Sequence, residues 1–312
     1  MKRFSMKDLT SMVSLQTEDV YQIFKTTARL KKERRRKGLN RPLLDGKILG
    51  MIFEKASLRT RVSFEVGMLH LGGHALYLDQ GNFKLGERES IYDVAKNMER
   101  FVDILMLRTF SHQAILDMAK YSAIPIINGL SDHEHPCQAL ADLYTIMEKR
   151  GDLKGQKLVF IGDGNNVANS LAYAAALTGM HFVCASPEGY MLKDSVLEAA
   201  RAKAVLGATI ERTTDVRAAV LGADCLYTDV WASMGQEKER QARVKAFSKY
   251  QINDQLLALA KPDAIIEHCL PAHRGEEITD SVIDSARSVV FDEAENRMHV
   301  QKAVMALLLG RG

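Results

Sequence analysis

The pentapeptide Ser57-Leu58-Arg59-Thr60-Arg61 has the residue types that bind a phosphate group. It follows a short apolar run and opens a long amphipathic segment, so it lies at the start of a predicted helix. A helix N-terminus presents backbone N–H groups without intrahelical partners and carries partial positive charge. Guanidinium groups match phosphate or carboxylate oxygens two at a time. We therefore expect an anion site here, and the alternative is a surface helix with two solvated arginines.

Three further motifs follow in order. They are His-Pro-Cys-Gln at 135–138, Asp-Val-Trp-Ala-Ser-Met-Gly at 229–235 and His-Cys-Leu-Pro at 268–271. Together with the pentapeptide they resemble the signature of the aspartate/ornithine carbamoyltransferase family, and the last two resemble its ornithine branch. The resemblance extends through nearly the whole chain. The family usually has threonine where Leu58 stands, so one hydroxyl is lost here while the backbone donor remains.

This resemblance implies a reaction without a covalent enzyme intermediate. The δ-amine of L-ornithine attacks the carbonyl carbon of carbamoyl phosphate, and a tetrahedral intermediate collapses to L-citrulline and phosphate. Neither a metal nor an organic cofactor is expected. The alternatives are a carbamoyltransferase for another amine (N-acetylornithine, putrescine or aspartate) and a non-catalytic anion-binding protein. The anion-binding alternative has no need of Asp229, Ser233 and Cys269 gathered at the ends of separate strands.

The resemblance also assigns a carbamoyl phosphate site, with Arg108, His135 and Cys269 as its catalytic residues. Hydrogen bonds from Thr60, Arg108 and His135 would stabilise the charged carbonyl oxygen, and Arg297 would close the anion pocket. Lys84 corresponds to a residue that the family contributes to the neighbouring subunit's site, and a solvated lysine is the alternative. The expected residues of this site are Ser57, Leu58, Arg59, Thr60, Lys84, Arg108, His135, Gln138, Cys269, Leu270 and Arg297.

A second site is expected for the amino acid. The α-ammonium group of ornithine requires a carboxylate, which Asp229 supplies. Its α-carboxylate requires amide, hydroxyl and backbone N–H donors, which Asn166, Ser233 and the backbone near Met234 supply. Cys269 is expected to face the δ-amine and the carbamoyl group. The alternative for this cysteine is a buried, small apolar residue.

Residues 162–167, Gly-Asp-Gly-Asn-Asn-Val, follow a predicted strand and suggest a competing function, a dinucleotide-dependent oxidoreductase. The dinucleotide fingerprint needs a third glycine where Val167 stands. It also needs an acidic residue at the end of the next strand, where Ser186 stands. We therefore interpret the glycines as a tight turn that brings Asn166 to the site.

Alternating strands and helices position these motifs and predict an α/β fold with two parallel sheets flanked by helices. The polar, glycine-rich stretch 151–155 marks the domain boundary. Residues 1–150 are expected to bind carbamoyl phosphate and residues 151–294 to bind ornithine. A final helix, 295–312, would pack back on the first domain. The predicted strands are 48–53, 74–78, 102–107, 124–127, 158–161, 181–185, 209–212, 225–228, 264–267 and 288–291.

Two details of these elements are also predicted. In the helix that follows Arg61, Val62 and Leu69 lie at helical spacing with Phe64 and Met68 on an adjoining stripe, so both faces are expected to be buried. Asn128-Gly129 is expected to turn the fourth strand toward residues 132–135. Those four residues are all ionisable, but a metal site is not favoured because no second cluster with ligand spacing appears.

Composition bounds the function further. The 312 residues include 42 basic and 39 acidic side chains, a net charge of +3 that gives no reason to expect a nucleic-acid partner. The N-terminus lacks the apolar core of a signal peptide, and no apolar run reaches about 18 residues, so no membrane partner is expected. The four cysteines show no paired spacing, which favours reduced thiols and a cytoplasmic location. By resemblance, the protein is expected to form a homotrimer or an assembly of trimers.

Overall fold

The computed structural model describes residues 4–79, 85–232, 237–310 and 312. Its contacts divide the chain into two compact units. The first comprises residues 1–140 together with 295–312, and the second comprises residues 141–294. The helices α5 (Pro136–Arg150) and α12 (Val290–Leu308) each contribute residues to both units. Among the described residues, none of the helices combines the length and apolar character that a membrane crossing needs.

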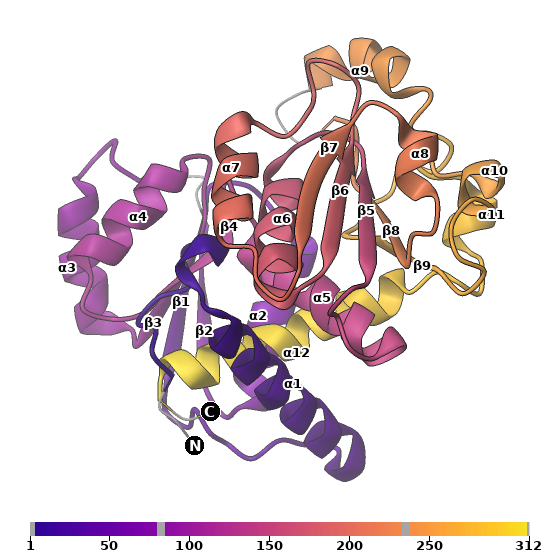
Figure 1. Ribbon diagram of the computed structural model, residues 1–312. Coiled ribbons are helices and arrows are strands. Elements are labelled where there is room, and N and C mark those ends of the chain that lie inside the picture. The colour runs from indigo at the N-terminus through magenta and orange to yellow at the C-terminus, as the bar shows by residue number, and fades with distance from the viewer. Residues whose placement is uncertain (1–3, 80–84, 233–236, 311) are drawn as a thin grey trace. The chain divides into compact units, whose positions relative to one another are not determined.

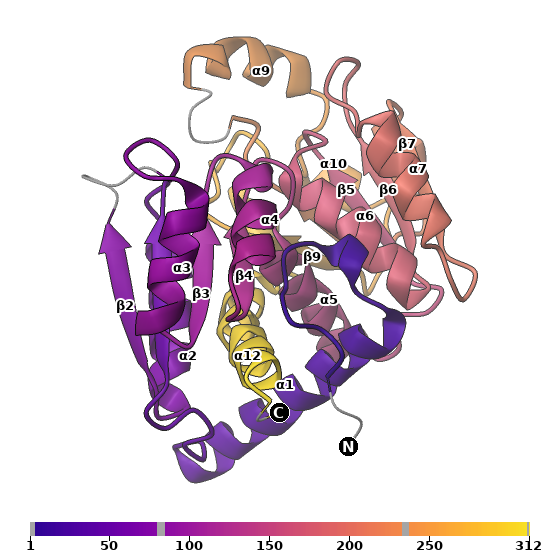
Figure 2. The same ribbon diagram turned by 90° about the vertical axis from the view of Figure 1, so that its left-hand side faces the viewer.

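The first unit is built on a four-stranded parallel sheet with the order β2-β1-β3-β4. The helices α3 and α4 cover one face of this sheet, and α2, α12 and α1 lie on the other (Figures 1 and 2). The elements are β1 (Ile48–Phe53), β2 (His74–Asp79), β3 (Ile104–Arg108), β4 (Ile126–Leu130), α1 (Thr17–Lys37), α2 (Leu58–His70), α3 (Ile91–Phe101), α4 (His112–Tyr121) and a 3-10 turn, Met12–Ser14.

The strand register brings the motif residues of this unit to one edge of the sheet. Phe53, the last residue of β1, pairs with Arg108, the last residue of β3, and Arg108 pairs with Leu130 of β4. The three loops that follow these strands therefore leave from the same edge. In a parallel sheet this is where ligands collect, next to the point at which the strand order reverses.

The C-terminal helix packs on the first unit, as predicted. Lys302 of α12 lies in the core and donates a hydrogen bond to Asn40 Oδ1 (2.6 Å). Lys31 of α1 donates to Asn296 Oδ1 of α12 (2.6 Å). Gly67 of α2 lies so near α12 that a Cβ atom there would be 3.2 Å from the Lys302 side chain. These contacts hold α1, α2 and α12 together.

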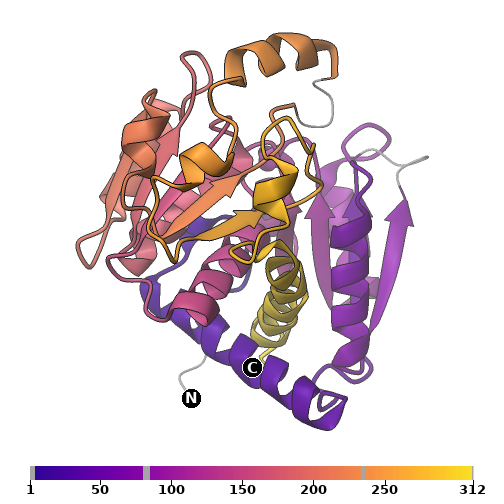
Figure 3. The ribbon, with the colours of Figure 1, turned by 90° about the vertical axis from the view of Figure 1, so that its right-hand side faces the viewer.

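The second unit is built on a five-stranded parallel sheet with the order β7-β6-β5-β8-β9. The helices α6 and α7 lie on one face, and α8, α10 and α11 lie on the other (Figures 1 and 3). The elements are β5 (Lys157–Ile161), β6 (His181–Ala185), β7 (Thr209–Thr213), β8 (Cys225–Thr228), β9 (Ile265–His268), α6 (Asn166–Thr178), α7 (Asp194–Ala202), α8 (Val216–Val220), α9 (Arg240–Phe247), α10 (Asp254–Leu257), α11 (Asp280–Ile283) and a 3-10 turn, Glu237–Glu239.

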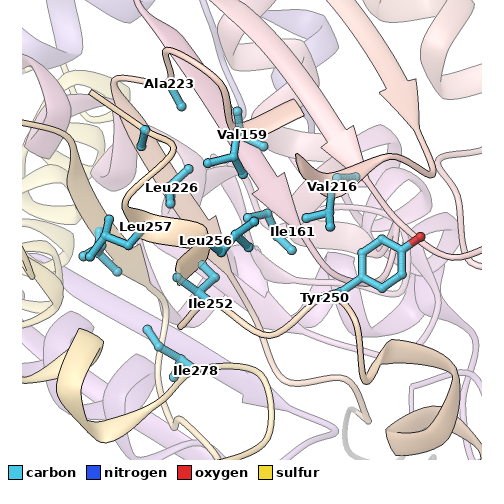
Figure 4. Packing of buried hydrophobic residues seen from close by; sticks show 14 of the residues in the cluster. Val159, Ile161, Val216, Ala223, Leu226, Tyr250, Ile252, Leu256, Leu257 and Ile278 are labelled. Carbon is cyan, nitrogen blue, oxygen red and sulfur yellow. The ribbon is translucent and has the colours of Figure 1, made fainter. Parts of the chain in front are cut away.

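An apolar cluster fills the space between this sheet and the helices α8, α10 and α11. Ile161 and Leu226 face it from the strands, and Val216, Leu256 and Ile278 close it from the other side (Figure 4). In the sheet, Ile161 pairs with Thr228, and Thr228 pairs with His268. The loops after β5, β8 and β9 therefore leave from one edge, as in the first unit.

The predicted fold class is confirmed, because both sheets are parallel and flanked by helices. The predicted strand at 288–291 is wrong. Ser288 makes only a single bridge to Ile266, and Val290 already begins α12. The backbone N–H of Glu293 bonds to the Val289 carbonyl, so the chain enters the helical hydrogen-bonding pattern before another strand residue can pair.

Two local predictions are also wrong. Asn128 and Gly129 lie inside β4, and a Cβ atom at Gly129 would approach Met106 Sδ to 2.3 Å. This glycine therefore permits close strand packing rather than a turn. On α2, Phe64 and Met68 are buried, whereas Val62 is 48% exposed and Leu69 is 54% exposed. Only one of the two apolar stripes of α2 faces the core of its own unit.

Candidate active site

In the first unit, the residues predicted for anion binding comprise a helix start and two buried cations. Ser57 caps α2, because its Oγ accepts the backbone N–H of Thr60 at 3.3 Å. The extended backbone of Ser57 ends the loop after β1, and the first helical turn, whose N–H groups lack intrahelical partners, begins directly after it. Leu58 is 76% exposed, and Arg59 is half-buried in the same turn.

Two guanidinium groups meet at the hydroxyl of Thr60, which is itself fully buried. Arg108 Nη1 donates to Thr60 Oγ1 at 3.2 Å, and Arg297 Nη2 of α12 donates to the same oxygen. Both arginines are about nine-tenths buried or more. A hydroxyl oxygen that accepts two bonds still has its O–H to donate. The arrangement therefore fixes two positive charges and one donor within the same small volume.

His135 and Gln138 belong to the same unit at the start of α5. Both side chains are buried, and the His135 carbonyl accepts the backbone N–H of Gln138 (3.0 Å) in the first turn of the helix. Burial lowers the pKa of His135 well below its usual value, and the charges of Arg297 and Arg108 lower it further. At neutral pH the imidazole is therefore uncharged, and it can offer one N–H without adding a third cation.

The structure also brings Lys55 to this region, a residue that the motif comparison overlooked. Lys55 lies between β1 and the Ser57 cap, and its Nζ stands 4.3 Å from the centre of the Phe110 ring. Burial lowers the pKa of Lys55, and the nearby charge of Arg108 lowers it further. Its position is a usable sequence signal, because Lys55 is a cation that follows β1, one of the strands next to the point at which the strand order reverses. Lys84 lies outside the described residues.

In the second unit, the residues predicted for amino-acid binding are organised around the carboxylate of Asp229, which follows β8. Cys269 Sγ donates to Asp229 Oδ1 at 3.1 Å, and the backbone N–H of Val230 donates to the same oxygen at 2.8 Å. Asn165 Nδ2 donates to Asp229 Oδ2 at 2.9 Å. Three donors from different loops therefore fix the carboxylate.

Asn165 is not among the predicted site residues, which include its neighbour Asn166. Asn165 is the N-cap of α6: its Oδ1 accepts the backbone N–H groups of Val167 and Ala168. Asn166 is the first residue of that helix and is half-buried. An Asn before an apolar helical run is the signal of an N-cap. Ser233 and Met234 lie outside the described residues.

The segment after β9 carries Cys269 and Leu270. Leu270 has a left-handed backbone (φ 55°), and its N–H bonds to His268 Nδ1 at 2.9 Å. Burial and the negative charge of Asp229 raise the pKa of Cys269 well above its usual value. The sulfur is therefore a neutral thiol that donates to Asp229, and it is not a thiolate nucleophile.

Two groups of described side chains have the residue types and proximity of metal ligands. They are Asp229, His268 and Cys269, and His273, Glu276 and Glu277. In the first group the thiol is protonated, and His268 Nε2 bonds to Glu277 Oε1 at 3.1 Å. The two ring nitrogens of His268 are therefore already bonded to Glu277 and to the Leu270 N–H, and the Asp229 carboxylate is bonded to its three donors. The chemistry of this set therefore fits a hydrogen-bonding network.

The loop at 132–135, with its four ionisable residues, is held by protein contacts. Glu134 is fully buried, and its carboxylate accepts the backbone N–H of Met12 (2.9 Å) and the hydroxyl of Ser11. The backbone N–H of His112 donates to Asp132 Oδ1 at 2.9 Å. These contacts fix the loop that presents His135.

Glycines shape the loop after β5, where the dinucleotide fingerprint was considered. The backbone N–H of Gly164 bonds to the Tyr190 carbonyl at 2.7 Å, and a Cβ atom at Gly164 would lie 2.4 Å from the Leu192 nitrogen. The loop is therefore packed closely against 190–192. These contacts support the interpretation of the glycines as a tight turn, which leaves the Asn165 cap at the sheet edge.

Comparison with known proteins identifies the family. Residues 7–148 match the carbamoyl-P binding domain of aspartate/ornithine carbamoyltransferase, and residues 154–308 match its Asp/Orn binding domain. An ornithine carbamoyltransferase of Archaeoglobus fulgidus is 51% identical over 98% of this chain and 98% of its own. An anabolic ornithine carbamoyltransferase of Pyrococcus furiosus is 51% identical over 97% of this chain and 96% of its own. A solved structure of ornithine carbamoyltransferase from Pyrococcus furiosus matches with a TM-score of 0.95 at 50% identity, and covers 99% of both chains. The chain, as its motifs predict, belongs to the aspartate/ornithine carbamoyltransferase family.

Proposed function

We propose that this protein transfers the carbamoyl group of carbamoyl phosphate to the δ-amine of L-ornithine and releases L-citrulline and phosphate. The observation that carries the anion half is the convergence of Arg108 and Arg297 on the buried Thr60 hydroxyl beside the α2 N-terminus. The relatives named ornithine carbamoyltransferase, at about half identity over nearly the full chain, support the ornithine half. The product direction agrees with the anabolic name of one of them.

The roles in the first unit follow from charge. Ser57, Arg59 and the backbone N–H groups of the first α2 turn hold the phosphate, and Leu58 contributes its backbone donor alone. Lys84 adds a cation from a neighbouring subunit. Thr60, Arg108 and uncharged His135 donate to the carbonyl oxygen, on which negative charge develops in the tetrahedral intermediate. Gln138 binds the carbamoyl NH2 group. Arg297 keeps the anion pocket positive from the C-terminal helix.

The roles in the second unit follow from hydrogen-bonding capacity. Asp229 binds the α-ammonium group of ornithine, and Asn166, Ser233 and the Met234 backbone bind its α-carboxylate. Cys269 faces the δ-amine, and the Leu270 carbonyl accepts from the carbamoyl NH2 group. The amine lone pair forms the new N–C bond and gives the tetrahedral intermediate, and the C–O bond to phosphate breaks when that intermediate collapses. The proton that leaves the nitrogen ends on phosphate, so that hydrogen phosphate departs and no cofactor is needed.

We further propose functional domains of 1–150 with 295–312 for carbamoyl phosphate, and 151–294 for ornithine. We also propose a homotrimer or an assembly of trimers in the cytoplasm, with no nucleic-acid or membrane partner. The exposed side chains of Leu58, Val62 and Leu69 on α2 form an apolar stripe that a second subunit could cover. The four cysteines are free, which suits a reducing compartment.

The direct test is product analysis. Purified protein is incubated with carbamoyl phosphate and L-ornithine. Citrulline is identified and quantified by mass spectrometry, and released phosphate is quantified in parallel. We expect citrulline and phosphate in equal amounts, with no citrulline when ornithine is omitted. Phosphate release without citrulline would contradict carbamoyl transfer to ornithine.

A further inference from the structure

Arg243 of α9 has a buried side chain that joins two loops of the second unit. We propose that Arg243 is a positioning residue for the amino-acid substrate: it holds the loop after β5 and the segment after β8 in the geometry that ornithine needs. This inference rests on the proposed function. Arg243 belongs to none of the motifs that identify the family, and its residue is only 6% exposed.

One nitrogen of Arg243 makes both of the relevant bonds. Nη1 donates to Asp163 Oδ2 at 2.7 Å and to the Trp231 carbonyl at 3.0 Å. Asp163 belongs to the loop after β5, and Trp231 belongs to the segment after β8. On the other side of the guanidinium group, Nε donates to Glu239 Oε2 at 3.0 Å. Arg243 therefore links the two loops directly and ties both to the start of α9.

Aromatic side chains fix the guanidinium group in this position. Its central carbon lies 5.0 Å from the centre of the Tyr190 ring. Trp231 stacks on Phe247 with ring centres 5.8 Å apart, and Tyr190 contacts the same Phe247 ring at 4.8 Å. A planar cation held against aromatic rings loses little further freedom when it binds its acceptors. The contact is therefore a rigid one.

Both loops that Arg243 joins carry residues of the amino-acid site. Two residues after Asp163 is Asn165, whose side chain bonds to Asp229, and the next residue is Asn166. Two residues before Trp231 is Asp229 itself. A displacement of either loop would move the carboxylate of Asp229 relative to the amide of Asn166. Distances of about 1 Å matter at such sites.

Arg243 is expected to act on more than stability. Removal of one partner of a buried ion pair is destabilising in itself, because the other charge is left unpaired. The cation here also binds a backbone carbonyl on a loop of irregular structure, which fixes the course of that loop. The expected consequence of its loss is therefore a change in ornithine binding in addition to a change in stability.

The test compares Arg243→Gln, Arg243→Lys and Asp163→Asn in the full-length protein. Steady-state kinetics give KM for ornithine and for carbamoyl phosphate, and thermal unfolding gives Tm. We expect Arg243→Gln to raise KM for ornithine by at least about tenfold, the scale of a lost charged hydrogen bond, while KM for carbamoyl phosphate changes less than about twofold. Arg243→Lys should restore part of the loss, because an ammonium group can still bond to Asp163 or to the Trp231 carbonyl.

Arg240→Gln is the matched control, because Arg240 lies on the same helix and pairs with Glu276 at the surface. Its kinetic constants should stay near those of the wild type. Asp163→Asn should reproduce the rise in KM for ornithine, and its combination with Arg243→Gln should add little. If Arg243→Gln does not fold, Arg243→Lys and Asp163→Asn carry the test.

Two outcomes would overturn the inference. One is an equal change of both KM values, and the other is a lower Tm with unchanged kinetics in the folded variants. Wild-type turnover is measured first: wild-type protein that does not carbamoylate ornithine contradicts the proposed function. Normal wild-type turnover with an unaltered KM in the Arg243 variants contradicts the positioning role alone.

Discussion

At the scale of single residues, Arg108 and Arg297 place two guanidinium groups on one hydroxyl oxygen, that of Thr60. Arg108 is the last residue of β3, so the sheet itself fixes its backbone. A donor fixed in advance costs no reorganisation when charge develops on the substrate. The proposed anion site therefore depends on backbone placement as much as on side-chain type.

Arg108→Ala should lower kcat/KM by about 10²–10³, the effect of removing one preorganised donor to a developing oxyanion. Arg108→Lys should recover only part of the loss, because an ammonium group is a point charge without the planar fork. Arg100→Ala, at the exposed end of α3, is the control and should leave turnover unchanged. Steady-state kinetics with both substrates measure the effect, and near-native turnover of Arg108→Ala would place the anion site elsewhere.

The sequence proposed site residues because each stands in a motif with a chemical reason for its residue types, and the structure brings Thr60, Arg108 and Arg297 together in one unit. The sequence missed Asn165, which contacts Asp229 while also capping α6. In the sequence alone Asn165 and Asn166 are equivalent donors. The geometry of the turn from strand to helix decides which of them reaches the Asp229 carboxylate. It also missed Lys55, whose relation to Arg108 depends on the pairing of β1 with β3.

At the scale of elements, α12 carries a buried polar network into the first unit. Lys302 Nζ bonds to Asn40 Oδ1 and lies 3.3 Å from His299 Nδ1, and His299 Nε2 lies 3.2 Å from Glu295 Oε1. Burial and the neighbouring charge of Lys302 lower the pKa of His299 to about 3. Burial lowers the pKa of Lys302 to about 8. Protonation of His299 would therefore weaken the network that holds α12.

The pKa of His299 predicts acid sensitivity. The folded pKa of His299 lies below its unfolded value of 6.5. Its contribution to the free energy of unfolding is therefore fully present above pH 6.5 and is lost as the pH falls toward about 3. The shift corresponds to at most about 5 kcal/mol. We expect Tm between pH 7 and pH 4 to fall less steeply in His299→Gln than in the wild type, while His74→Gln, at the exposed start of β2, keeps the wild-type slope. An identical slope in all three proteins would contradict this role of His299.

Of the ten strands predicted from the sequence pattern, nine are confirmed. The pattern misassigned 288–291, because the run Val289-Val290-Phe291 is apolar in either conformation and the bond from Glu293 to Val289 selects the helix. It also placed a turn at Asn128-Gly129, where the glycine is needed for contact with Met106. Both errors concern contacts between residues far apart in the sequence or at a helix start, which a local pattern does not contain.

At the scale of the whole molecule, the exposed apolar stripe of α2 supports the proposed oligomer. The sequence predicted that both faces of α2 are buried, and the second stripe is exposed in the single chain. A helix with two apolar faces is compatible with one face in the core and the other against another subunit. Lys84, which follows β2 in the sequence, is proposed to act in the neighbouring subunit's site.

Subunit mixing tests this arrangement. Lys84→Ala and Arg59→Ala proteins should each be nearly inactive, and a mixture that has exchanged subunits should regain activity, because some sites then contain both native residues. Native mass spectrometry of tagged subunits establishes the exchange. The control is a mixture of Arg59→Ala with Arg108→Ala, both in the same proposed half-site, which should regain nothing. A Lys84 mixture that stays inactive after exchange would place Lys84 in its own subunit's site or in solvent.

Ornithine is the proposed second substrate, and the ratio of kcat/KM among amines distinguishes it from other acceptors. Putrescine lacks the α-carboxylate and α-ammonium groups that Asn166, Ser233 and Asp229 are proposed to bind. N-acetylornithine lacks the ammonium charge, and aspartate brings a second carboxylate toward Asp229. Buried polar groups left without partners typically cost several kcal/mol. We therefore expect kcat/KM for L-ornithine to exceed that for each of the three by at least about 10³. In Asp229→Ala the ratio of kcat/KM for ornithine to kcat/KM for putrescine should fall. A wild-type preference for putrescine, N-acetylornithine or aspartate would contradict the ornithine assignment and leave carbamoyl transfer intact.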